Sequence, residues 1–316
     1  MSKPRVLITG ASGFVGRNTT EYLAAAGKYE VFACTDPVAD LRDPEAVARV
    51  LGEFRPDCVI NCAAVVSTRK TAADPAGGDV AATNLRMFFN IVRALPAGAR
   101  LLQLGSGAEY DSRAYQPKMR EEFFDTSVPA DPYGFSKYVM SQYAARAENI
   151  TVLRIFGIFG KYEDYTFKFI SNAIVKNLLG LPIIVNRNVR FDYLWIGDFC
   201  RIIEKFIGAK PQYRHYNVTP TRSTDLLTLA RMINTIGGGK SAVRVLKRGF
   251  NPEYTGNNRR LLSELGGFKF TSCSDGVKQL YAYYTSKLRE LDLATVRKDP
   301  YLKLCSRPIT HAKGKI

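Results

Sequence analysis

Short apolar runs alternate with amphipathic stretches along the first half of the chain. Val6–Ile8 is an apolar run that ends in Thr9-Gly10, and Phe14–Ala26 repeats apolar positions with helical spacing and without proline. Further candidates follow in the same alternation: a strand over Glu30–Cys34, a helix over Pro44–Phe54, and strands over Cys58–Ile60 and Leu101–Leu104. Strands separated by helices need crossover connections, so the pattern predicts an α/β fold with a doubly wound parallel sheet.

Beyond Arg154 the pattern changes to longer helices separated by short strands. It predicts helices over Tyr165–Leu179, Asp198–Ile207 and Thr224–Ile236, and a strand over Ile183–Val185. We therefore expect a second, smaller α/β lobe. The expected division is a first domain over residues 1–160 with a returning segment at about 188–215, a smaller lobe over 161–187 and 216–291, and a basic tail over 292–316.

The composition excludes several classes of protein. Of the 316 residues, 46% are hydrophobic and 23% charged, which is typical of a globular protein and not of a disordered or collagen-like one. The two histidines, His215 and His311, leave little material for a histidine-based triad or a zinc site. Six scattered cysteines without a Cys-x-x-Cys pair predict free thiols, and no apolar window reaches membrane-spanning length. We expect a cytoplasmic protein without bound metal.

The chain carries a large excess of positive charge. Forty-five Lys and Arg against 29 Asp and Glu give a net charge of +16, which attracts polyanions such as nucleic acid or a nucleoside diphosphate. Residues 287–316 contain eight Lys or Arg and three acids. A solvated basic tail is favoured over a nucleic-acid arm here, and charge alone does not choose between the two kinds of polyanion.

A glycine-rich loop joins the first predicted strand to the first predicted helix. Glycines at this place allow a tight turn, a close approach of the backbone to a pyrophosphate, and tight packing of helix on strand. The helix N-terminus adds free N–H groups and a partial positive charge. The loop therefore predicts a dinucleotide site. Its candidate contacts are Gly10, Ser12, Gly13, Phe14, Val15 and Gly16.

The end of the second predicted strand bears on the choice of dinucleotide. An acidic residue there accepts hydrogen bonds from the adenosine ribose, whereas a basic one favours a 2′-phosphate. Asp36 occupies this place, and neither its turn nor the glycine loop contains Arg or Lys. NAD(H) is therefore favoured and NADP(H) stays open, with Asp40 and Leu41 as further candidate contacts. A turn-forming role for Asp36 before Pro37 is the alternative.

Two further motifs supply acid/base chemistry. Tyr133 and Lys137 are four residues apart at the start of a predicted helix that continues toward Arg146, so they share one helical face. The ammonium group of Lys137 can stabilise a tyrosinate at position 133. Ser106 ends an apolar strand, which places its hydroxyl at the carboxyl edge of the sheet, where it can hold a carbonyl oxygen.

The combination of glycine loop, serine after a central strand and Tyr-x-x-x-Lys resembles the extended short-chain dehydrogenase/reductases, the NAD-dependent epimerase/dehydratase family of nucleotide-sugar enzymes. The resemblance covers roughly residues 3–290 and includes Ala63-Ala64, Asn84 and Arg154. It implies a Rossmann-type dinucleotide-binding domain, a substrate-binding lobe, and reversible hydride transfer between nicotinamide and a sugar carbon. Tyr133 would then donate the proton, Lys137 would lower the pKa of the tyrosine and hold the nicotinamide ribose, and Ser106 would orient the carbonyl.

Departures from the family's patterns reduce the number of reactions that this chain is expected to catalyse. Dehydratases that resemble this chain carry an Asp-Glu pair directly after the serine or threonine, where this chain has Gly107 and Ala108. Epimerase-reductases similar to GDP-fucose synthase place a cysteine at the position of Ala108 and a histidine in the substrate lobe, which lacks one here from Phe156 to Arg190. The sequence therefore favours reduction of a ketone over water loss or epimerisation.

Residues near the serine and several arginines are candidates for substrate binding. Arginines suit the two negative charges of a nucleotide diphosphate. For Glu109, a proton-carrying role and a structural or solvated carboxylate both stay open. Asn84 either belongs to the supporting hydrogen-bond network or is a helix residue satisfied by the backbone of the sheet. The substrate-binding candidates are Ser106, Gly107, Ala108, Glu109, Tyr133, Arg187, Arg190 and Arg259.

The favoured function is a reductase that transfers hydride to C4 of a nucleotide-linked 4-keto-6-deoxysugar. A nucleotide-sugar C4 epimerase with retained NAD is the alternative. A nucleic-acid-binding relative of the same fold ranks third, because a pure binding module has no use for the Ser106, Tyr133 and Lys137 geometry. The resemblance also implies a homodimer through helices near residues 80–95 and 132–147.

Overall fold

A computed structural model describes residues 2–66 and 79–306 of the chain. Within this part the chain divides into two compact units, each built from three segments. The first unit comprises Met1–Tyr162, Arg190–Thr224 and Pro252–Cys273. The second comprises Glu163–Val189, Asp225–Asn251 and Ser274–Ile316 as far as these residues are described.

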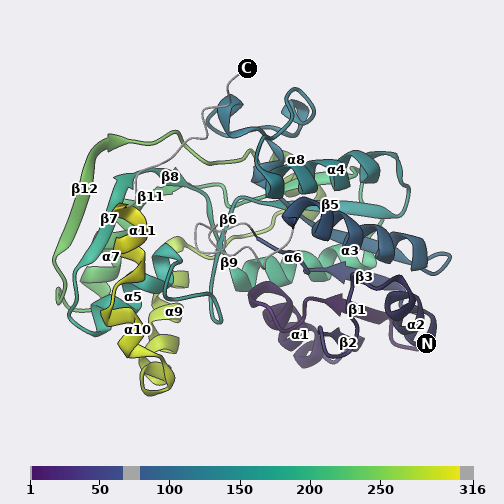
Figure 1. Cartoon of the computed structure of the whole chain (residues 1–316), viewed down its shortest axis with the longest axis horizontal. Coiled ribbons are helices and arrows are strands. Elements are labelled where there is room, and N and C mark those ends of the chain that lie inside the picture. Colours follow the sequence, from purple (N-terminus) through teal and green to yellow (C-terminus); the bar gives the residue numbers. More distant parts are fainter. Residues whose placement is uncertain (1, 67–78, 307–316) are drawn as a thin grey trace. The chain divides into compact units, whose positions relative to one another are not determined.

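The first unit is built on a six-stranded sheet in which all neighbouring strands are parallel, so the predicted doubly wound fold is confirmed (Figure 1). The strand order is β10-β5-β4-β3-β1-β2. Because β2 lies on one side of β1 and β3 on the other, the chain reverses its direction across the sheet at β1, where such folds bind ligands. The strands are β1 (Arg5–Thr9), β2 (Glu30–Cys34), β3 (Cys58–Asn61), β4 (Arg100–Ser106), β5 (Ile150–Ile155) and β10 (His215–Val218).

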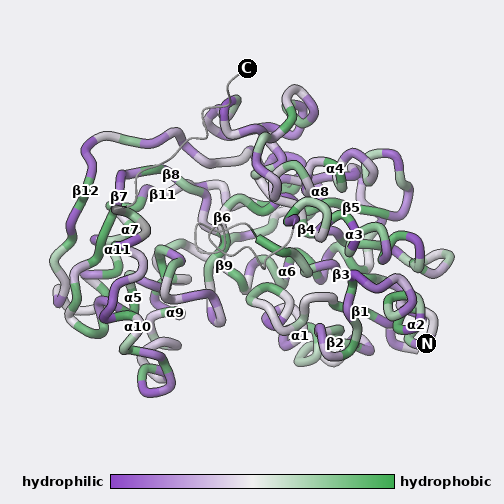
Figure 2. Tube along the Cα trace, in the orientation of Figure 1, coloured by the Kyte–Doolittle hydropathy of each residue, from purple (hydrophilic) through white to green (hydrophobic). Residues whose placement is uncertain are grey.

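Helices cover both faces of this sheet, and two apolar cores lie between helices and strands (Figure 1). One core joins Val6 and Ile8 of β1 to α1 and α6, and the other joins Leu7 of the same strand to α2, α3 and α4. The side chains of alternate residues on one strand thus pack into opposite cores. This explains why the central strands are continuous apolar runs, for which Figure 2 uses green. The helices are α1 (Phe14–Ala26), α2 (Pro44–Phe54), α3 (Val80–Ala94), α4 (Pro132–Arg146) and α6 (Ile196–Gly208).

Capping residues set the ends of these helices. Asp43 begins α2 by accepting a hydrogen bond from the backbone N–H of Glu45, and Pro44 follows at the first helical position. Asp131 and Pro132 begin α4 in the same way, with Asp131 accepting from the backbone of Gly134. The remaining elements of the first unit are short: η2 (Gly107–Glu109), η3 (Ser112–Ala114), η4 (Glu121–Phe123), β6 (Gly157–Phe159), β8 (Arg190–Phe191), β9 (Tyr193–Trp195) and α8 (Arg259–Leu265).

The second unit contains a parallel strand pair and several helices. Strand β7 pairs with β12, whose residues are mostly exposed, and α5 and α7 pack on β7. Strand β11 (Thr224–Asp225) and helix α9 (Cys273–Lys287) span the division between the units. The other elements are α5 (Phe169–Leu178), β7 (Ile183–Asn188), α7 (Leu226–Ile236), β12 (Val243–Phe250), η5 (Leu288–Glu290), α10 (Leu293–Arg297) and α11 (Pro300–Ser306).

Three segments differ from the sequence-based expectation. Residues 292–306, expected as a solvated basic tail, form α10 and α11 and bury the side chains of Val296, Tyr301 and Cys305; residues 307–316 lie outside the described part. Residues 216–224 and the segment Pro252–Cys273, both expected in the smaller lobe, belong to the first unit. In the described residues we find no helix that is both long enough and apolar enough to cross a membrane.

Candidate active site

The glycine loop after β1 is packed so closely that side chains would not fit. Gly10 has a positive φ of 60°, and a Cβ built on it would lie 2.8 Å from the backbone of Ala63 after β3. A Cβ on Gly16 in α1 would lie 2.2 Å from the carbonyl oxygen of Gly10. Both distances are too short for real contacts, so α1 can approach the strand ends only with glycine at these positions.

The first turn of α1 keeps its backbone N–H groups available. Gly13 is the N-cap residue, and no side chain of the described residues caps the helix. Ser12 is exposed beside it, while Phe14 and Val15 pack against the apolar core below. The loop therefore presents bare backbone donors and the positive end of a helix at the carboxyl edge of the sheet, as a pyrophosphate requires.

A buried polar ladder crosses the ends of the central strands, and sequence reasoning missed it. Thr9 donates to Asn61 Oδ1 at 2.6 Å, and Asn61 Nδ2 donates to Gln103 Oε1 at 2.7 Å. Asn61 Oδ1 also accepts from the backbone N–H of Ala63 at 3.2 Å. These bonds join β1, β3 and β4 and fix the backbone at Ala63, beside the glycine loop. The signal in the sequence that could have revealed this ladder is the presence of polar residues inside otherwise apolar strands.

Asn84 in α3 fixes the backbone that follows Ala63 and Ala64. Its side chain exchanges two hydrogen bonds of 2.8 Å with the N–H and carbonyl of Val65, and it also donates to Ser136 Oγ at 3.3 Å. Val65 follows β3, so the backbone that Asn84 bonds lies outside the sheet, and the bond to Ser136 adds a side-chain partner. Asn84 thereby ties this segment to α4.

The acidic residues after β2 lie near a cation. Asp36 is exposed just beyond the strand, while Leu41 is buried. Asp40 forms an ion pair of 2.8 Å with Arg42, and this hydrogen-bonded guanidinium lowers the pKa of the Asp40 carboxyl. Arg42 also interacts electrostatically with Asp36. The turn itself contains no base, but a guanidinium lies close to it.

Ser106, Tyr133 and Lys137 come together where β4 meets α4. Ser106 ends β4, and its side chain interacts with the phenol of Tyr133 in the first turn of α4. Lys137, one turn later, is buried, donates to the carbonyl of Leu104 at 2.7 Å and lies 5.8 Å from the centre of the Tyr133 ring. The serine and tyrosine hydroxyls can therefore act on one substrate oxygen, with a buried amine close behind them.

Burial shifts the pKa values of this pair in opposite directions. It raises the pKa of Tyr133 to about 12, although the interaction with Ser106 acts to lower it. Burial lowers the pKa of Lys137 to about 8, opposed by the charges of Glu109 and Cys62. Tyr133 is therefore protonated at neutral pH and suited to donate a proton, while Lys137 changes its charge near the working pH.

Glu109 has the partners of a structural carboxylate. It is buried, and its Oε1 accepts from the backbone N–H of Ser106 at 2.9 Å. Its Oε2 accepts from Ser141 Oγ of α4 at 2.6 Å and forms an ion pair with Arg154 of β5, whose side chain is fully buried. Glu109 thereby links the turn that carries Ser106 to the helix that carries Tyr133 and Lys137.

Two tyrosines at Ser106 were missed by sequence reasoning. The phenol of Tyr254 interacts with Ser106 and Tyr115, and the hydroxyl of Tyr115 donates to the carbonyl of Gly107 at 2.7 Å. A Cβ on Gly107 would lie 2.6 Å from Tyr254 Oη, so glycine at position 107 makes room for this phenol. No local motif marks Tyr254, because it is far from Ser106 in the sequence.

The other substrate-binding candidates lie on several different elements. Ala108 donates its backbone N–H to Ser106 Oγ at 3.1 Å. Arg190 in β8 and Arg259 in α8 have exposed side chains, and the backbone carbonyl of Arg190 accepts from the N–H of Tyr254 at 3.0 Å. Arg187 belongs to β7 of the second unit, and its buried Nε has no hydrogen-bond partner among the described residues.

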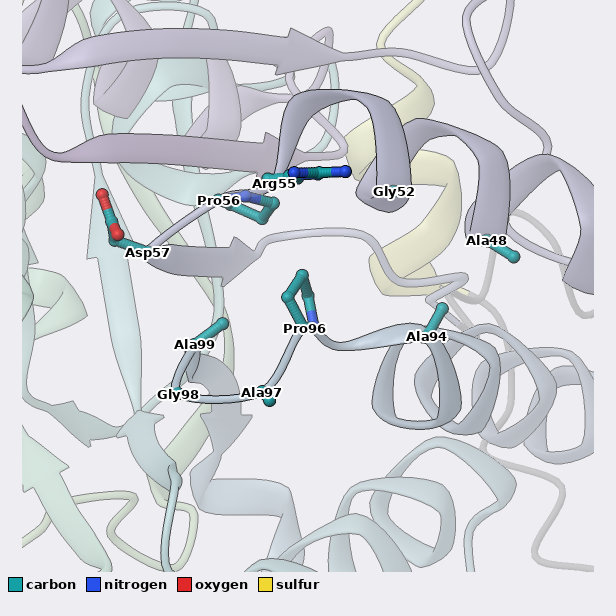
Figure 3. A pocket seen from close by; sticks show the side chains of 10 residues that line it. All are labelled: Ala48, Gly52, Arg55, Pro56, Asp57, Ala94, Pro96, Ala97, Gly98 and Ala99. Carbon is teal, nitrogen blue, oxygen red and sulfur yellow. The ribbon is translucent and has the colours of Figure 1, made fainter.

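A surface hollow of about 620 Å³ lies at the opposite edge of the sheet (Figure 3). It is lined by the residues before β3 and β4, including Asp57 and Ala99, and by the ends of α2 and α3. Most of its lining is alanine, glycine and proline. Because none of the candidate residues lines it, the hollow is separate from the site at the carboxyl edge.

The chain matches the NAD dependent epimerase/dehydratase family over residues 6–219. It is 38% identical over 304 residues to GDP-L-fucose synthase from Azorhizobium caulinodans, covering 89% of this chain and 96% of the relative. It is 24% identical over 303 residues to GDP-6-deoxy-D-talose 4-dehydrogenase from Aggregatibacter actinomycetemcomitans, covering 92% of this chain and 100% of the relative.

Solved structures share the fold. UDP-glucose 4-epimerase from Thermotoga maritima, solved with UDP-glucose, superposes with a TM-score of 0.78 at 20% identity, covering 90% of this chain and 99% of that chain. GDP-L-fucose synthetase from Naegleria fowleri, bound to NADP, gives a TM-score of 0.78 at 16% identity, covering 92% and 95%. For dTDP-glucose 4,6-dehydratase from Bacillus anthracis in complex with NAD, the TM-score is 0.75 at 17% identity, with 90% and 98% covered.

Proposed function

The chain belongs to the NAD dependent epimerase/dehydratase family, and on that premise we propose that it reduces C4 of a nucleotide-linked 4-keto-6-deoxysugar. Like its relatives, it is an NAD(P)-dependent oxidoreductase of nucleotide sugars. The observation that carries the finer proposal is the pairing of the Ser106 and Tyr133 side chains at the carboxyl edge of the central sheet. Two hydroxyl donors aimed at one point suit a ketone oxygen, which only accepts hydrogen bonds.

The residues at this edge fit a dinucleotide. Gly10 and Gly16 keep the backbone bare at the strand ends, and the first turn of α1 offers N–H groups to a pyrophosphate. Asp36 at the end of β2 would accept from the adenosine ribose, and Lys137 would hold the nicotinamide ribose. A bound nicotinamide dinucleotide supplies the hydride for the reaction.

The protein's own residues handle the proton. Tyr133 donates its phenolic proton to the C4 oxygen of the substrate, while Ser106 donates a hydrogen bond to the same oxygen. The tyrosinate that remains is stabilised by the positive charge of Lys137, one helical turn away. Each group thus favours the charge that develops as the ketone becomes an alcohol.

The residue two positions after Ser106 supports reduction without epimerisation. The epimerase-reductases that resemble this chain use a cysteine there to move protons at carbon, whereas Ala108 has a methyl group. The neighbouring Glu109 cannot substitute for that cysteine, because both its oxygens bind groups inside the protein. The loop after Ser106 therefore has no free acid or base among its described residues.

We propose NADH as the preferred reductant and NADPH as the weaker one. The exposed carboxylate of Asp36 suits the two ribose hydroxyls of NADH and repels a 2′-phosphate. Arg42 interacts electrostatically with Asp36, and its guanidinium is already paired with Asp40. That pairing supports the preference for NADH.

A panel of nucleotide ketosugars tests the proposed function. GDP- and dTDP-linked 4-keto-6-deoxysugars are incubated with the enzyme and either NADH or NADPH, and the absorbance at the reduced nicotinamide band is followed. We expect consumption of NADH in proportion to the ketosugar and an alcohol at C4. An epimerase would instead keep tightly bound NAD and interconvert nucleotide sugars without net consumption of NADH, which would overturn the proposal.

The pKa of Lys137 predicts the pH dependence of the reduction. Because burial lowers this pKa to about 8, the ammonium is present below pH 8 and is lost above it. The positive charge stabilises the tyrosinate that forms at Tyr133, so kcat/KM is expected to fall as the pH rises through about 8. This quantity reports the free enzyme, and a profile from pH 6 to 10 measures it.

The Lys137→Arg variant is the control for this pH profile. A guanidinium stays charged over the whole range, so we expect the decline near pH 8 to disappear in the variant even if its overall activity is lower. A wild-type profile that stays flat up to pH 10 would contradict the role given to Lys137.

A further inference from the structure

The second unit holds most of the chain's excess positive charge. Its three segments make up less than a third of the chain, yet they contain 17 Lys and Arg against 7 Asp and Glu, a net charge of +10 out of +16. From Leu226 to Pro252 the sequence has five Lys or Arg and no acid. Ser106, Tyr133 and Lys137 all belong to the first unit. The reaction proposed for them therefore does not explain the charge of the second unit.

Strand β12 carries part of this charge and is uncovered on both faces. Every residue from Arg244 to Phe250 is exposed. Because successive side chains of a strand point to opposite faces, Arg244 and Leu246 share one face. The other face carries Val245 and Lys247. Each face therefore offers a cation beside an apolar side chain. Phe250, near the end of the strand, is 64% exposed, the largest fraction among the exposed large apolar side chains of the described residues.

The outer edge of β12 has backbone groups that face no other strand. Among the strands of the described residues β12 pairs only with β7, and Figure 1 shows it as the outer strand of the pair. The carbonyl of Ala242 accepts from the N–H of Ile183 at 2.9 Å. Backbone groups turn toward the partner strand at alternate residues, so Arg244 turns its groups toward β7 and Val245 turns its N–H and carbonyl outward. An exposed edge of this kind is a template for pairing with another strand.

The charges and the unpaired edge together select the occupant. A second copy of β12 would set Arg244, Lys247 and Arg248 against the same cations, and like charges on neighbouring strands destabilise a sheet. A lipid surface leaves the outward backbone groups unsatisfied once the apolar side chains enter the hydrocarbon. A nucleic acid would use the cations but not the backbone edge, and aliphatic Val245 and Leu246 give its bases nothing to stack on. An extended acidic peptide satisfies all these groups, because its backbone pairs with the edge and its carboxylates meet the cations.

We propose that β12 is a docking edge, on which an extended acidic segment of a partner protein adds as a third strand beside β12 and β7. The main-chain hydrogen bonds of the added strand supply affinity, and its alternate side chains supply specificity. Its carboxylates pair with Arg244, Lys247 and Arg248, and its apolar side chains contact Val245 and Leu246. This interaction goes beyond the proposed reduction, because no residue of β12 belongs to the candidate active site.

A fluorescein-labelled peptide of four Glu-Val repeats is the probe. Its titration with the full chain is followed by fluorescence anisotropy. We expect saturable binding that weakens as the salt concentration rises, because salt screens the charges. The same peptide with every amide N-methylated keeps all its carboxylates but has no N–H group to pair with the edge. We expect it to bind at least about tenfold more weakly. Equal binding of the two peptides would show attraction by charge alone and would overturn the proposal.

The Val245→Pro variant tests the edge from the side of the protein. It removes the outward N–H and leaves all the cations in place, and proline is tolerated on an edge strand where the N–H faces solvent. We expect peptide binding to weaken at least about tenfold at an unchanged melting temperature. Val245→Thr is the matched control, because it keeps the branched shape and the N–H, and it should bind within about twofold of wild type. If Val245→Pro melts early, the N-methylated peptide still decides, since it leaves the protein unaltered.

Lys247→Glu tests the charge of the edge, and Arg231→Glu is its control. Arg231 is exposed on α7 of the same unit, so both variants change the net charge by the same amount. We expect Lys247→Glu to weaken peptide binding about fivefold, since an opposed pair of like charges replaces an opposite-charge pair. Arg231→Glu should stay within about twofold of wild type. Equal losses in the two variants would mean that only the net charge of the unit matters, which contradicts the proposal.

The other occupants are outcomes of the same assays. A wild-type chain that does not bind the peptide overturns the proposal. Binding of single-stranded RNA or phosphatidylserine vesicles that tolerates Val245→Pro and is lost in Lys247→Glu, without binding of the peptide, would assign the strand to phosphate recognition instead. Self-association in sedimentation velocity that Val245→Pro abolishes would assign the edge to a second copy of this chain, which also overturns the proposal.

Discussion

Replacing Tyr133 by phenylalanine is expected to lower the turnover of ketone reduction about 10²–10⁴-fold, the usual contribution of a positioned general acid. The substitution removes only the hydroxyl that meets Ser106, and the ring stays over Lys137 in the first turn of α4. The proton must then come from water, and Ser106 keeps a single hydrogen bond to the substrate oxygen. Turnover is measured from the disappearance of NADH at saturating ketosugar.

Dinucleotide binding and a neighbouring tyrosine give the controls for this result. NADH affinity, followed by quenching of protein fluorescence, should be almost unchanged, because the backbone donors proposed for the pyrophosphate follow β1, whereas the missing oxygen belongs to α4. Tyr138 is on the same helix, and its hydroxyl donates to the exposed residue Asp125. Tyr138→Phe should therefore keep wild-type turnover. A Tyr133→Phe variant that is equally active would show that another group supplies the proton.

The sequence predicts the first half of the fold almost residue by residue, since local signals set these elements. Helix α1 ends where Gly27 adopts a left-handed conformation with φ 66°, and α2 begins at the Asp43-Pro44 cap. The helix expected from Tyr165 starts later, at Phe169. Asp164 binds the backbone N–H groups of the following residues in a turn, which delays the helical hydrogen bonds.

The end of the described chain shows where charge counting is misleading. Eight basic residues near the C-terminus predict a solvated tail, yet Val296 and Tyr301 are buried in the second unit. Arg297 and Lys303 occupy other positions of the same two short helices, so net charge says little about burial. Lys176 of α5 is itself buried and pairs with Asp299 at 2.7 Å, between α10 and α11.

Some residues of the candidate site could be predicted from the sequence and others could not. Ser106, Tyr133 and the glycine loop follow from strand ends, because parallel strands bring their carboxyl ends to one edge. Tyr254 could not be predicted in this way, because the chain between it and Ser106 passes through both units before it returns. Asn61 and Gln103 are intermediate cases. Their strands are predictable, but their bonds to one another depend on the register of β3 beside β4.

The largest effect on stability is expected at Glu109. Glu109→Gln should lower the free energy of unfolding of the first unit by about 3–5 kcal/mol, as is typical when one partner of a buried ion pair loses its charge. The guanidinium of Arg154 is fully buried, and one of its nitrogens, Nη2, already has no hydrogen-bond partner among the described residues. Its pKa is raised above the ordinary value despite desolvation, because Glu109 is close. It therefore stays charged in the variant, without its counter-ion. Urea unfolding followed by circular dichroism measures the change.

Two further variants separate the buried charge from the shape of the side chain. In Glu109→Gln with Arg154→Met, both charges are gone, so much of the lost stability should return, since hydrophobic replacement of a whole buried pair is often neutral or stabilising. Glu122 forms an ion pair with Arg260 at the surface, and Glu122→Gln should change stability by less than about 1 kcal/mol. If the double variant is as unstable as Glu109→Gln, the uncompensated charge is not the cause. The loss would then come from the hydrogen bonds of the carboxylate to Ser106 and Ser141, which join the catalytic serine to α4.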